Sequence, residues 1–308
     1  MLEDRFVFIN KEFVAWQKAT VHMMCHSFSR GSAIFEVLSL HATVSGPAVF
    51  RLHDHIDRLF KSARLLDMQL PLSRDEFCEA VAGTVRKNSL EKGFIKIMCY
   101  YPQVAVEIYP PQKMLDVAVF ALDPAVDLEG IDFPIDAVEK GISACLSKWR
   151  KLDPQTVPIE AKAAANYLNG MVAHGDAQKR GFDQAIMLDT QGFIAEGGTE
   201  SVFLVRNGRL LAPVLGTVLQ SITRRSILQA AQTEGIETVE ARLRPELLFE
   251  ADEIFTGCTP FKVFPVRQME DRMLGEIPGP LTRRLSALMK NIVAGSDERF
   301  KDWLFAVG

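Results

Sequence analysis

A short segment rich in proline, glycine and acidic residues, residues 123–130, divides this chain into two regions with separate strand and helix patterns. Such a composition is typical of a connector, and 308 residues exceed the usual size of one domain. We therefore expect a small α+β domain at residues 1–122, a linker at residues 123–130, and a larger domain at residues 131–308.

The first region contains both helix-like and strand-like patterns of apolar residues. Apolar residues recur at helical spacing over residues 53–66, which should leave Arg58 off the apolar stripe. Ser73 and Glu76 form the signature of a capping box at the start of a second helix. Paired strands are expected at residues 5–16, around Asn10-Lys11, and a further strand at residues 45–52. Two apolar runs then predict another strand pair at residues 94–101 and 115–122.

The second region alternates between strands and helices. We expect helices at residues 167–180, 222–233, 245–250 and 281–293. We expect strands at residues 184–188, 193–195, 202–205, 210–212, 236–241 and 253–256, and a hairpin at residues 263–274. Asn207-Gly208 is a favourable hairpin turn between two of these strands, and the C-terminal Trp303-Leu-Phe is expected to be a packed tail.

Charge and hydropathy indicate a small-molecule partner. The net charge is only -4 and no block of five like charges occurs, so we expect neither nucleic acid nor a membrane as partner. The N-terminus lacks the basic-then-apolar order of a signal peptide, and no apolar run reaches the length of a membrane span. A cytoplasmic protein is expected. Its five scattered cysteines fit reduced thiols better than disulfides.

His22, Cys25 and His26 are spaced so that a helix would place all three on one face, a pattern that could suggest a metal site. No fourth ligand is evident, so we expect no metal.

Lys162 stands among small apolar residues, with the hydroxyl of Tyr167 five positions on. A lysine kept out of water is readily deprotonated, and a neutral amine can attack an aldehyde. The alternative is a solvated side chain, since lysine is rarely buried.

Three further segments carry groups that could bind a charged ligand. Ser221 and Thr223 open a helix, whose N-terminus favours a phosphate, although helix capping is the alternative. Residues 256–259 end a strand and can turn donors toward one point, or form an ordinary turn. Residues 196–201 offer a carboxylate beside Gly-Gly, which more commonly marks a hairpin. Pyridoxal phosphate has three groups that a protein binds: an aldehyde, a phosphate and a ring nitrogen. The segments above offer an amine for the aldehyde, hydrogen-bond donors for the phosphate and a carboxylate for the ring nitrogen.

Taken together, these motifs resemble the class IV (fold-type IV) pyridoxal-phosphate aminotransferases, most closely the branched-chain amino-acid aminotransferases. The similar stretches are residues 50–63, 148–150, 158–168, 195–201, 221–224 and 251–259. They cover nearly the whole length in one order. The resemblance implies a two-domain α+β fold, with a small α+β domain and a larger β-barrel-like domain flanked by helices, and a homodimer.

The resemblance also assigns roles at the cofactor. It makes Lys162 the catalytic Schiff-base lysine, which also moves the proton between substrate Cα and cofactor C4′. Tyr167 would hydrogen-bond the phenolic oxygen, and Glu196 would pair with the ring nitrogen. The other implied cofactor-binding residues are Arg58, Ser201, Ser221, Ile222, Thr223, Cys258 and Thr259. Ser201 departs from the family, which often has asparagine at this position.

The residues expected to bind the substrate differ more from those of the family. Pro260, after Thr259, stands where related enzymes carry an alanine whose N–H helps hold the substrate carboxylate, and proline has no N–H. Arg30 replaces the usual tyrosine and Lys96 the usual arginine. Either cation could supply the lost contact, or both could be solvated. By its match Phe35 would line the substrate side-chain pocket, although a core position is as common.

The function implied is transamination between a branched-chain-like amino acid and a 2-oxo acid such as 2-oxoglutarate. A D-amino-acid or (R)-amine transaminase of the same fold is the main alternative. An aminodeoxychorismate lyase fits less well, because residues 162–167 look like the branched-chain form. A pyridoxal-phosphate-binding protein without turnover is the alternative from another class.

Overall fold

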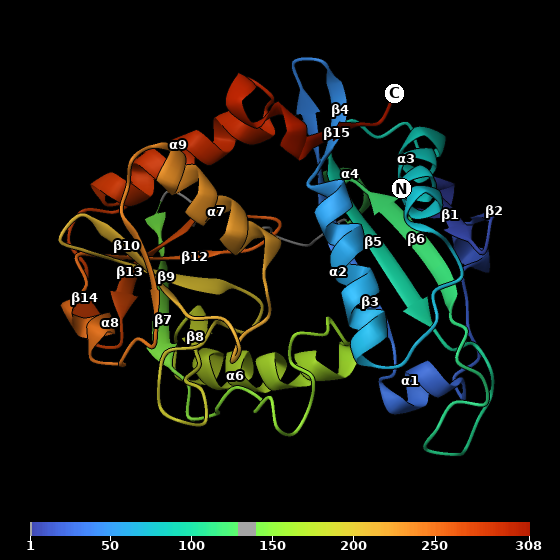
Figure 1. Cartoon of the computed structure of the whole chain (residues 1–308), viewed down its shortest axis with the longest axis horizontal. Helices are drawn as coiled ribbons and strands as arrows, with labels where there is room; N and C mark the ends of the chain where they lie inside the picture. The colour runs from blue at the N-terminus through green and yellow to red at the C-terminus, as the bar shows by residue number, and fades with distance from the viewer. Residues whose placement is uncertain (1, 129–139) are drawn as a thin grey trace. The chain divides into compact units, whose positions relative to one another are not determined.

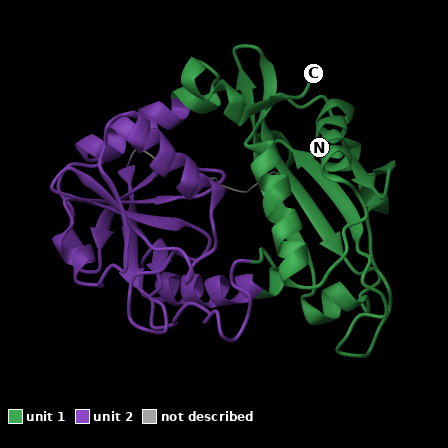
Figure 2. Cartoon of the chain, viewed as in Figure 1, with its two compact units in different colours: residues 1–132, 161–165, 291–308 green, residues 133–160, 166–290 purple. Residues whose placement is uncertain are grey.

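The computed structural model describes residues 2–128 and 140–308, and the chain forms two compact units (Figure 2). Unit 1 comprises residues 1–132, 161–165 and 291–308, and unit 2 comprises residues 133–160 and 166–290. The predicted linker at residues 123–130 lies close to the first boundary, although residues 129 and 130 fall outside the described residues. The sequence did not predict that two later segments belong to unit 1.

Within the described residues, unit 1 is built on an antiparallel seven-stranded sheet with the order β15-β4-β3-β5-β6-β1-β2 (Figure 1). Its strands are β1 (Phe6–Ile9), β2 (Glu12–Ala15), β3 (Ile34–Thr43), β4 (Gly46–Phe50), β5 (Gly93–Tyr100), β6 (Asp116–Leu122) and β15 (Leu304–Ala306). Its helices are η1 (Leu2–Asp4), η2 (Trp16–Lys18), α1 (His26–Arg30), α2 (Leu52–Leu65), α3 (Arg74–Lys87), α4 (Pro124–Asp127) and η4 (Glu298–Trp303).

Helices α2 and α3 cover one face of this sheet. Alternate residues of β3 and β5, such as Ile34, Leu38 and Ile97, point into the core that both helices close, as the two-residue period of a strand requires. Helix α3 begins with the predicted capping box of Ser73 and Glu76. The residues of β3 and β5 that alternate with this core lie on the other face of the sheet, and two of the predicted site residues are among them.

Unit 2 contains a mixed sheet with the order β11-β10-β9-β12-β13-β7-β8, and β14 pairs with β13. Its strands are β7 (Ile142–Leu146), β8 (Gln184–Ile186), β9 (Ser201–Arg206), β10 (Arg209–Pro213), β11 (Thr238–Ala241), β12 (Glu253–Gly257), β13 (Phe264–Met269) and β14 (Arg272–Met273). Among its described residues, the helices are α6 (Tyr167–Lys179), α7 (Ile222–Thr233) and α8 (Leu247–Glu250), with η3 (Ala164–Asn166) before α6 and α9 (Pro280–Val293) toward the C-terminus.

Most predicted elements are confirmed within one or two residues, including α2, β5, β6, α6, α7 and β12. The predicted strand at residues 193–195 is wrong, since only an isolated bridge joins Leu188 and Ile194. The packed tail is confirmed, because β15 pairs with β4 and the Arg51 guanidinium lies 3.5 Å from the Trp303 ring centroid. In the described part of the chain, none of the helices has the length and hydropathy needed to span a membrane.

Candidate active site

Lys162 belongs to unit 1, where its backbone is fixed on two sides. The segment at residues 161–165 runs beside the start of β3, so that the Phe35 N–H donates to the Lys162 carbonyl at 3.1 Å and the Ala164 N–H donates to the Ala33 carbonyl at 2.8 Å. The Lys162 N–H donates to Ser62 Oγ of α2 at 2.9 Å. These bonds position the residue in extended backbone before η3, and not on the exposed face of a helix.

The ring of Phe35 lies near two lysine amines. Lys162 Nζ is 4.9 Å from the ring centroid, and Lys96 Nζ is 5.3 Å from it. Lys96 reaches the ring because it pairs with Val37 in the β3–β5 register, two residues from Phe35 on the same face. Three of the residues predicted for the site are therefore neighbours in unit 1. Phe35 is only half-buried and stands outside the unit 1 core.

The Arg30 guanidinium makes a different contact in unit 1. It is the last residue of α1, is exposed, and donates from Nη2 to the Val106 carbonyl at 2.7 Å. Its guanidinium therefore holds the loop between β5 and β6, while Lys96 is the cation beside Phe35.

Arg58 is buried, so its expected place off the apolar stripe of α2 does not expose it. Its Nε donates to Glu36 Oε1 at 2.7 Å and its Nη2 donates to Glu36 Oε2 at 2.6 Å. His55 Nδ1 lies 2.7 Å from the same Oε2. Glu36 is fully buried on β3, and a bidentate carboxylate is the partner that best satisfies a buried guanidinium. Arg58 is therefore not a solvated surface arginine.

Burial alone raises the pKa of Glu36. The charge of Arg58, together with hydrogen bonds from Arg58 and His55, outweighs burial and lowers this pKa to about 2. The Glu36 carboxylate therefore stays ionised at neutral pH. Since Arg58 and Ser62 are four residues apart on α2, they share a helix face, and Ser62 holds the backbone of Lys162. One helix thus positions both the buried cation and the lysine.

In unit 2, Glu196 forms an ion pair that the sequence did not predict. Lys151 Nζ lies 2.5 Å from Glu196 Oε1, and the two side chains are 12% and 10% exposed. Lys151 follows directly on the matched residues 148–150, but neither apolar periodicity nor motif spacing distinguishes it from a solvated lysine.

Tyr167 opens helix α6, which meets the turn after Glu196 in a backbone contact. A Cβ on Gly170 would lie 2.3 Å from the Gly198 carbonyl oxygen, so only glycine allows this approach. Gly170 is three residues from Tyr167 and shares its helix face. The close packing of α6 against this turn therefore requires glycine at position 170, and it places Tyr167 on the helix that adjoins the turn after Glu196.

Ser201 starts β9 and is buried. Its backbone forms a bridge with Glu196, which closes the turn at residues 196–201.

Helix α7 begins after Ser221 and packs against the end of β12. Ser221 caps α7 by accepting from the Arg224 N–H at 3.2 Å, so the capping interpretation is confirmed for its side chain. Ile222 and Thr223 are buried in the first turn. A Cβ on Gly257 would lie 2.9 Å from Ile227 Cδ1, one turn of α7 beyond Thr223. The strand that ends in residues 256–259 therefore packs against the helix that Ser221 and Thr223 open.

The turn after Gly257 contains Cys258, Thr259 and Pro260. The Cys258 N–H donates to the Phe261 carbonyl at 3.1 Å. Lys262, which no sequence motif distinguishes, is 8% exposed and donates from Nζ to the Thr259 carbonyl at 2.7 Å. Burial lowers the pKa of Lys262 to about 7. A buried amine thus holds the turn in which Pro260 removes an N–H.

The ring nitrogens of His26 contact protein atoms. Nδ1 lies 2.7 Å from Ser32 Oγ, and Nε2 lies 3.2 Å from the Ile108 carbonyl oxygen. His22 Nδ1 accepts from the Met24 N–H at 3.0 Å. Among residues 2–128 and 140–308, no three histidine, cysteine, aspartate or glutamate side chains gather as metal ligands do.

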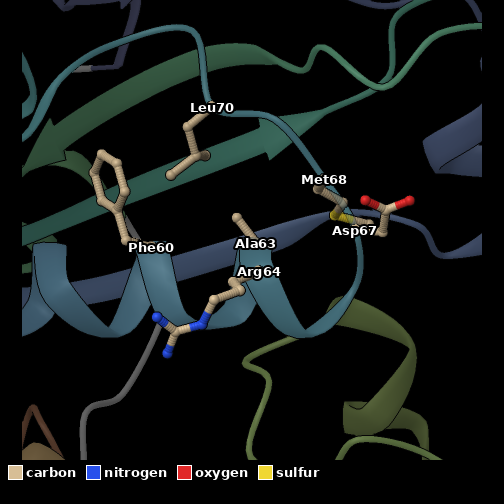
Figure 3. Close-up of a pocket in the computed structure, with 6 residues that line it drawn as sticks. All are labelled: Phe60, Ala63, Arg64, Asp67, Met68 and Leu70. Atoms are coloured by element: carbon tan, nitrogen blue, oxygen red, sulfur yellow. The ribbon is translucent and has the colours of Figure 1, made fainter.

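A surface hollow near the C-terminal end of α2 contains none of the predicted site residues (Figure 3). It is lined by Phe60, Ala63, Arg64, Asp67, Met68 and Leu70. The charged groups of Arg64 and Asp67 point away from each other, and Asp67 pairs with Lys113. This hollow offers no set of groups that converge on one ligand.

The chain matches known proteins over nearly its whole length. The family model of amino-transferase class IV matches residues 33–269. The branched-chain-amino-acid aminotransferase of Escherichia coli (strain K12) is 33% identical over 301 residues, which cover 97% of this chain and 96% of that protein.

Solved structures give the same result. A crystal structure of the Escherichia coli branched-chain amino acid aminotransferase has a TM-score of 0.94 at 33% identity and covers 99% of both chains. The branched-chain amino acid aminotransferase of Thermobaculum terrenum, solved in its PLP form, has a TM-score of 0.90 at 29% identity and covers 100% of both chains. The matches define a fold-type IV transferase, as predicted. This chain belongs to the class IV aminotransferases.

Proposed function

We propose that this aminotransferase uses pyridoxal phosphate to exchange an amino group between a branched-chain amino acid and a 2-oxo acid such as 2-oxoglutarate. The names of the relatives support this substrate class. The observation that carries the proposal is the amine of Lys162, 4.9 Å from the Phe35 ring centroid, in a segment fixed by Ser62 and β3. When bound, the cofactor supplies a ring that accepts the electrons left when substrate Cα loses its proton.

The residues present fit this cofactor chemically. In unit 1, Lys162 would hold the aldehyde carbon and move the proton at substrate Cα, and Arg58 would bind the phosphate. In unit 2, Tyr167 would bind the phenolic oxygen and Glu196 the ring nitrogen. The N–H groups that open α7 at Ile222 and Thr223 suit a phosphate, and the remaining proposed cofactor contacts are Ser201, Ser221, Cys258 and Thr259.

For the substrate, we propose Lys96 as the cation that replaces the N–H lost at Pro260. Its amine lies beside Phe35, as does Lys162, whereas the Arg30 guanidinium is bonded to the Val106 carbonyl. Phe35 would line the pocket for the substrate side chain.

A panel of amino donors tests the function. The holoenzyme is supplied with 2-oxoglutarate and, in turn, L-leucine, L-isoleucine, L-valine, D-alanine or (R)-1-phenylethylamine, and consumption of the 2-oxo acid is followed. L-glutamate is tested as donor in a separate assay with the 2-oxo acid of leucine as acceptor. We expect turnover with the L-branched-chain donors. Turnover with D-alanine or the amine alone would make the chain a D-amino-acid or (R)-amine transaminase. A lyase would act on aminodeoxychorismate without a 2-oxo acid, and a binding protein would turn over nothing.

We also propose a homodimer formed through an apolar surface of unit 1. This surface joins α1 and its preceding turn to the loop between β5 and β6, where the Ala105 N–H donates to the Met24 carbonyl at 3.4 Å. Its exposed side chains are Met23, Met24, Phe28, Val104, Val106, Ile108 and Tyr109, of which Ile108 is 83% exposed. Contiguous exposed apolar side chains favour a protein interface. Sedimentation should give a dimer, and Ile108→Lys should shift it toward monomer, while an unchanged dimer in this variant would exclude the surface.

We further propose a cytoplasmic location. All five cysteines are free and four are buried, which suits a reducing compartment. Fractionation of the native cell tests it, and recovery outside the cytoplasm would contradict it.

A further inference from the structure

The ion pair of Lys151 and Glu196 is fixed by the backbone of both partners. The Lys151 N–H donates to the Leu188 carbonyl at 2.8 Å, and the Met187 N–H donates to the Glu196 carbonyl at 2.9 Å. Two consecutive residues, Met187 and Leu188, therefore hold the lysine and the glutamate. The side-chain atoms Lys151 Nζ and Glu196 Oε1 then meet at 2.5 Å.

The environment of this pair gives each charge a large effect on the other. Both side chains are about nine-tenths buried, and in such surroundings a carboxylate is far more costly to leave ionised without a partner than it is in water. The side chain of a glutamate also has several rotatable bonds, so an ionic contact at one oxygen restricts where the other oxygen points.

A nearby lysine forms an ion pair that is not buried. Lys148, three residues earlier, pairs with Asp176 of α6 at 3.0 Å, but its side chain is 68% exposed. An ion pair of that kind contributes little. The ion pair of Lys151 is buried, unlike that of Lys148. Its partner, Glu196, is the residue that we propose to bind the ring nitrogen of the cofactor.

We propose that Lys151 is a positioning residue that keeps the Glu196 carboxylate oriented toward the ring nitrogen of the cofactor. The inference rests on the role of Glu196 in the proposed function and adds a residue to it. Lys151 does not touch the reacting atoms. It acts through Glu196, so its removal should weaken only those interactions that depend on the ring nitrogen.

A binding experiment with two ligands tests this. The full-length chain is stripped of cofactor and dialysed to equilibrium against pyridoxal 5'-phosphate or against 1-deazapyridoxal 5'-phosphate, in which a C–H group replaces the ring nitrogen. Lys151→Met should lower the affinity for pyridoxal phosphate by about tenfold, the order expected for the loss of one charged hydrogen-bond partner. Its affinity for the deaza analogue should equal that of the unaltered chain.

Matched variants separate this role from a structural one. Lys151→Arg should restore pyridoxal phosphate binding, and Lys148→Met should bind as the unaltered chain does. In a Glu196→Gln background, Lys151→Met should have no further effect. If Lys151→Met does not fold, Lys151→Gln keeps a polar side chain and takes its place in the same comparison.

The outcomes distinguish the positioning role of Lys151 from the role of Glu196 at the ring nitrogen. Unchanged binding of pyridoxal phosphate by the Lys151 variants, or an equal loss for both ligands, overturns the inference while leaving Glu196 in its role. If Glu196→Gln itself binds both ligands as the unaltered chain does, the proposed role of Glu196 fails, and the inference fails with it.

Discussion

Ser62 Oγ accepts a hydrogen bond from the backbone N–H of Lys162 at 2.9 Å, across 100 residues of sequence. The hydroxyl is fully buried on α2, one helical turn from Arg58. Helix α2 therefore fixes the backbone of Lys162, the lysine that we propose to bind the cofactor aldehyde. The same face of the helix carries Arg58.

Ser62→Ala should destabilise the protein and impair turnover. The Lys162 N–H loses its hydrogen bond to the Ser62 hydroxyl, and the loss of one such hydrogen bond costs about 0.5–1.5 kcal/mol. Urea unfolding measures this loss. Ser226→Ala is the control, because the buried Ser226 hydroxyl donates only within its own helix, to the Ile222 carbonyl. An equal, small loss in both variants would show that Ser62 does not hold Lys162.

Gly170→Ala should destabilise unit 2, because its Cβ would lie 2.3 Å from the Gly198 carbonyl oxygen. Overpacking of this kind costs about 1–3 kcal/mol. Gly175→Ala on the same helix has no atom within 4 Å of the added Cβ, and it should stabilise by up to about 1 kcal/mol through helix propensity. Thermal unfolding of both variants should give shifts of opposite sign, and a rise in Tm for Gly170→Ala would contradict the contact.

Glu36→Gln should remove a pH-dependent part of the stability. The pKa of Glu36 is lowered from 4.5 to about 2 in the folded protein, so its contribution is complete above pH 4.5 and is lost as the pH falls from there toward 2. Near pH 7, breaking this buried contact should cost about 3–5 kcal/mol.

Unfolding free energies measured from pH 3 to pH 7 test this pH dependence. The difference between the unaltered chain and Glu36→Gln should shrink as the pH falls. A constant difference would mean that Glu36 is not ionised in the folded state.

Lys96→Ala should raise the KM for branched-chain donors by about tenfold or more, as expected for a lost charged contact to a carboxylate. Arg30→Ala should have a smaller effect, since its guanidinium is bonded to the Val106 carbonyl. Steady-state kinetics with L-leucine measure both. An unchanged KM in both variants would remove both cations from the substrate site.

Local signals in the sequence predicted much of this structure. The capping box of Ser73 and Glu76 and the helical spacing in α2 depend on residues close in sequence, and both are confirmed. The return of residues 161–165 to unit 1 was not predicted, because their partners on β3 and α2 are more than 90 residues away.

The site residues also divide into those that local sequence motifs predict and those that depend on contacts between distant residues. Phe35, Lys96 and Lys162 were predicted from motifs, and the structure brings them together. Glu36 and Lys151 were missed. Their roles come from ion pairs to Arg58 and Glu196, 22 and 45 residues away along the chain, and a charged residue gives no sign in sequence that it is buried and paired.

The central claim is that Lys162 carries the cofactor, and borohydride reduction tests it most directly. The reagent fixes the cofactor to its lysine, and mass spectrometry of the digested protein locates the modified residue. Lys262 is the strongest competitor, because burial lowers its pKa to about 7 and keeps part of its amine neutral. We predict the added mass on the peptide that contains Lys162 and its absence from Lys162→Ala. The added mass on Lys262, or on no lysine, would contradict the account.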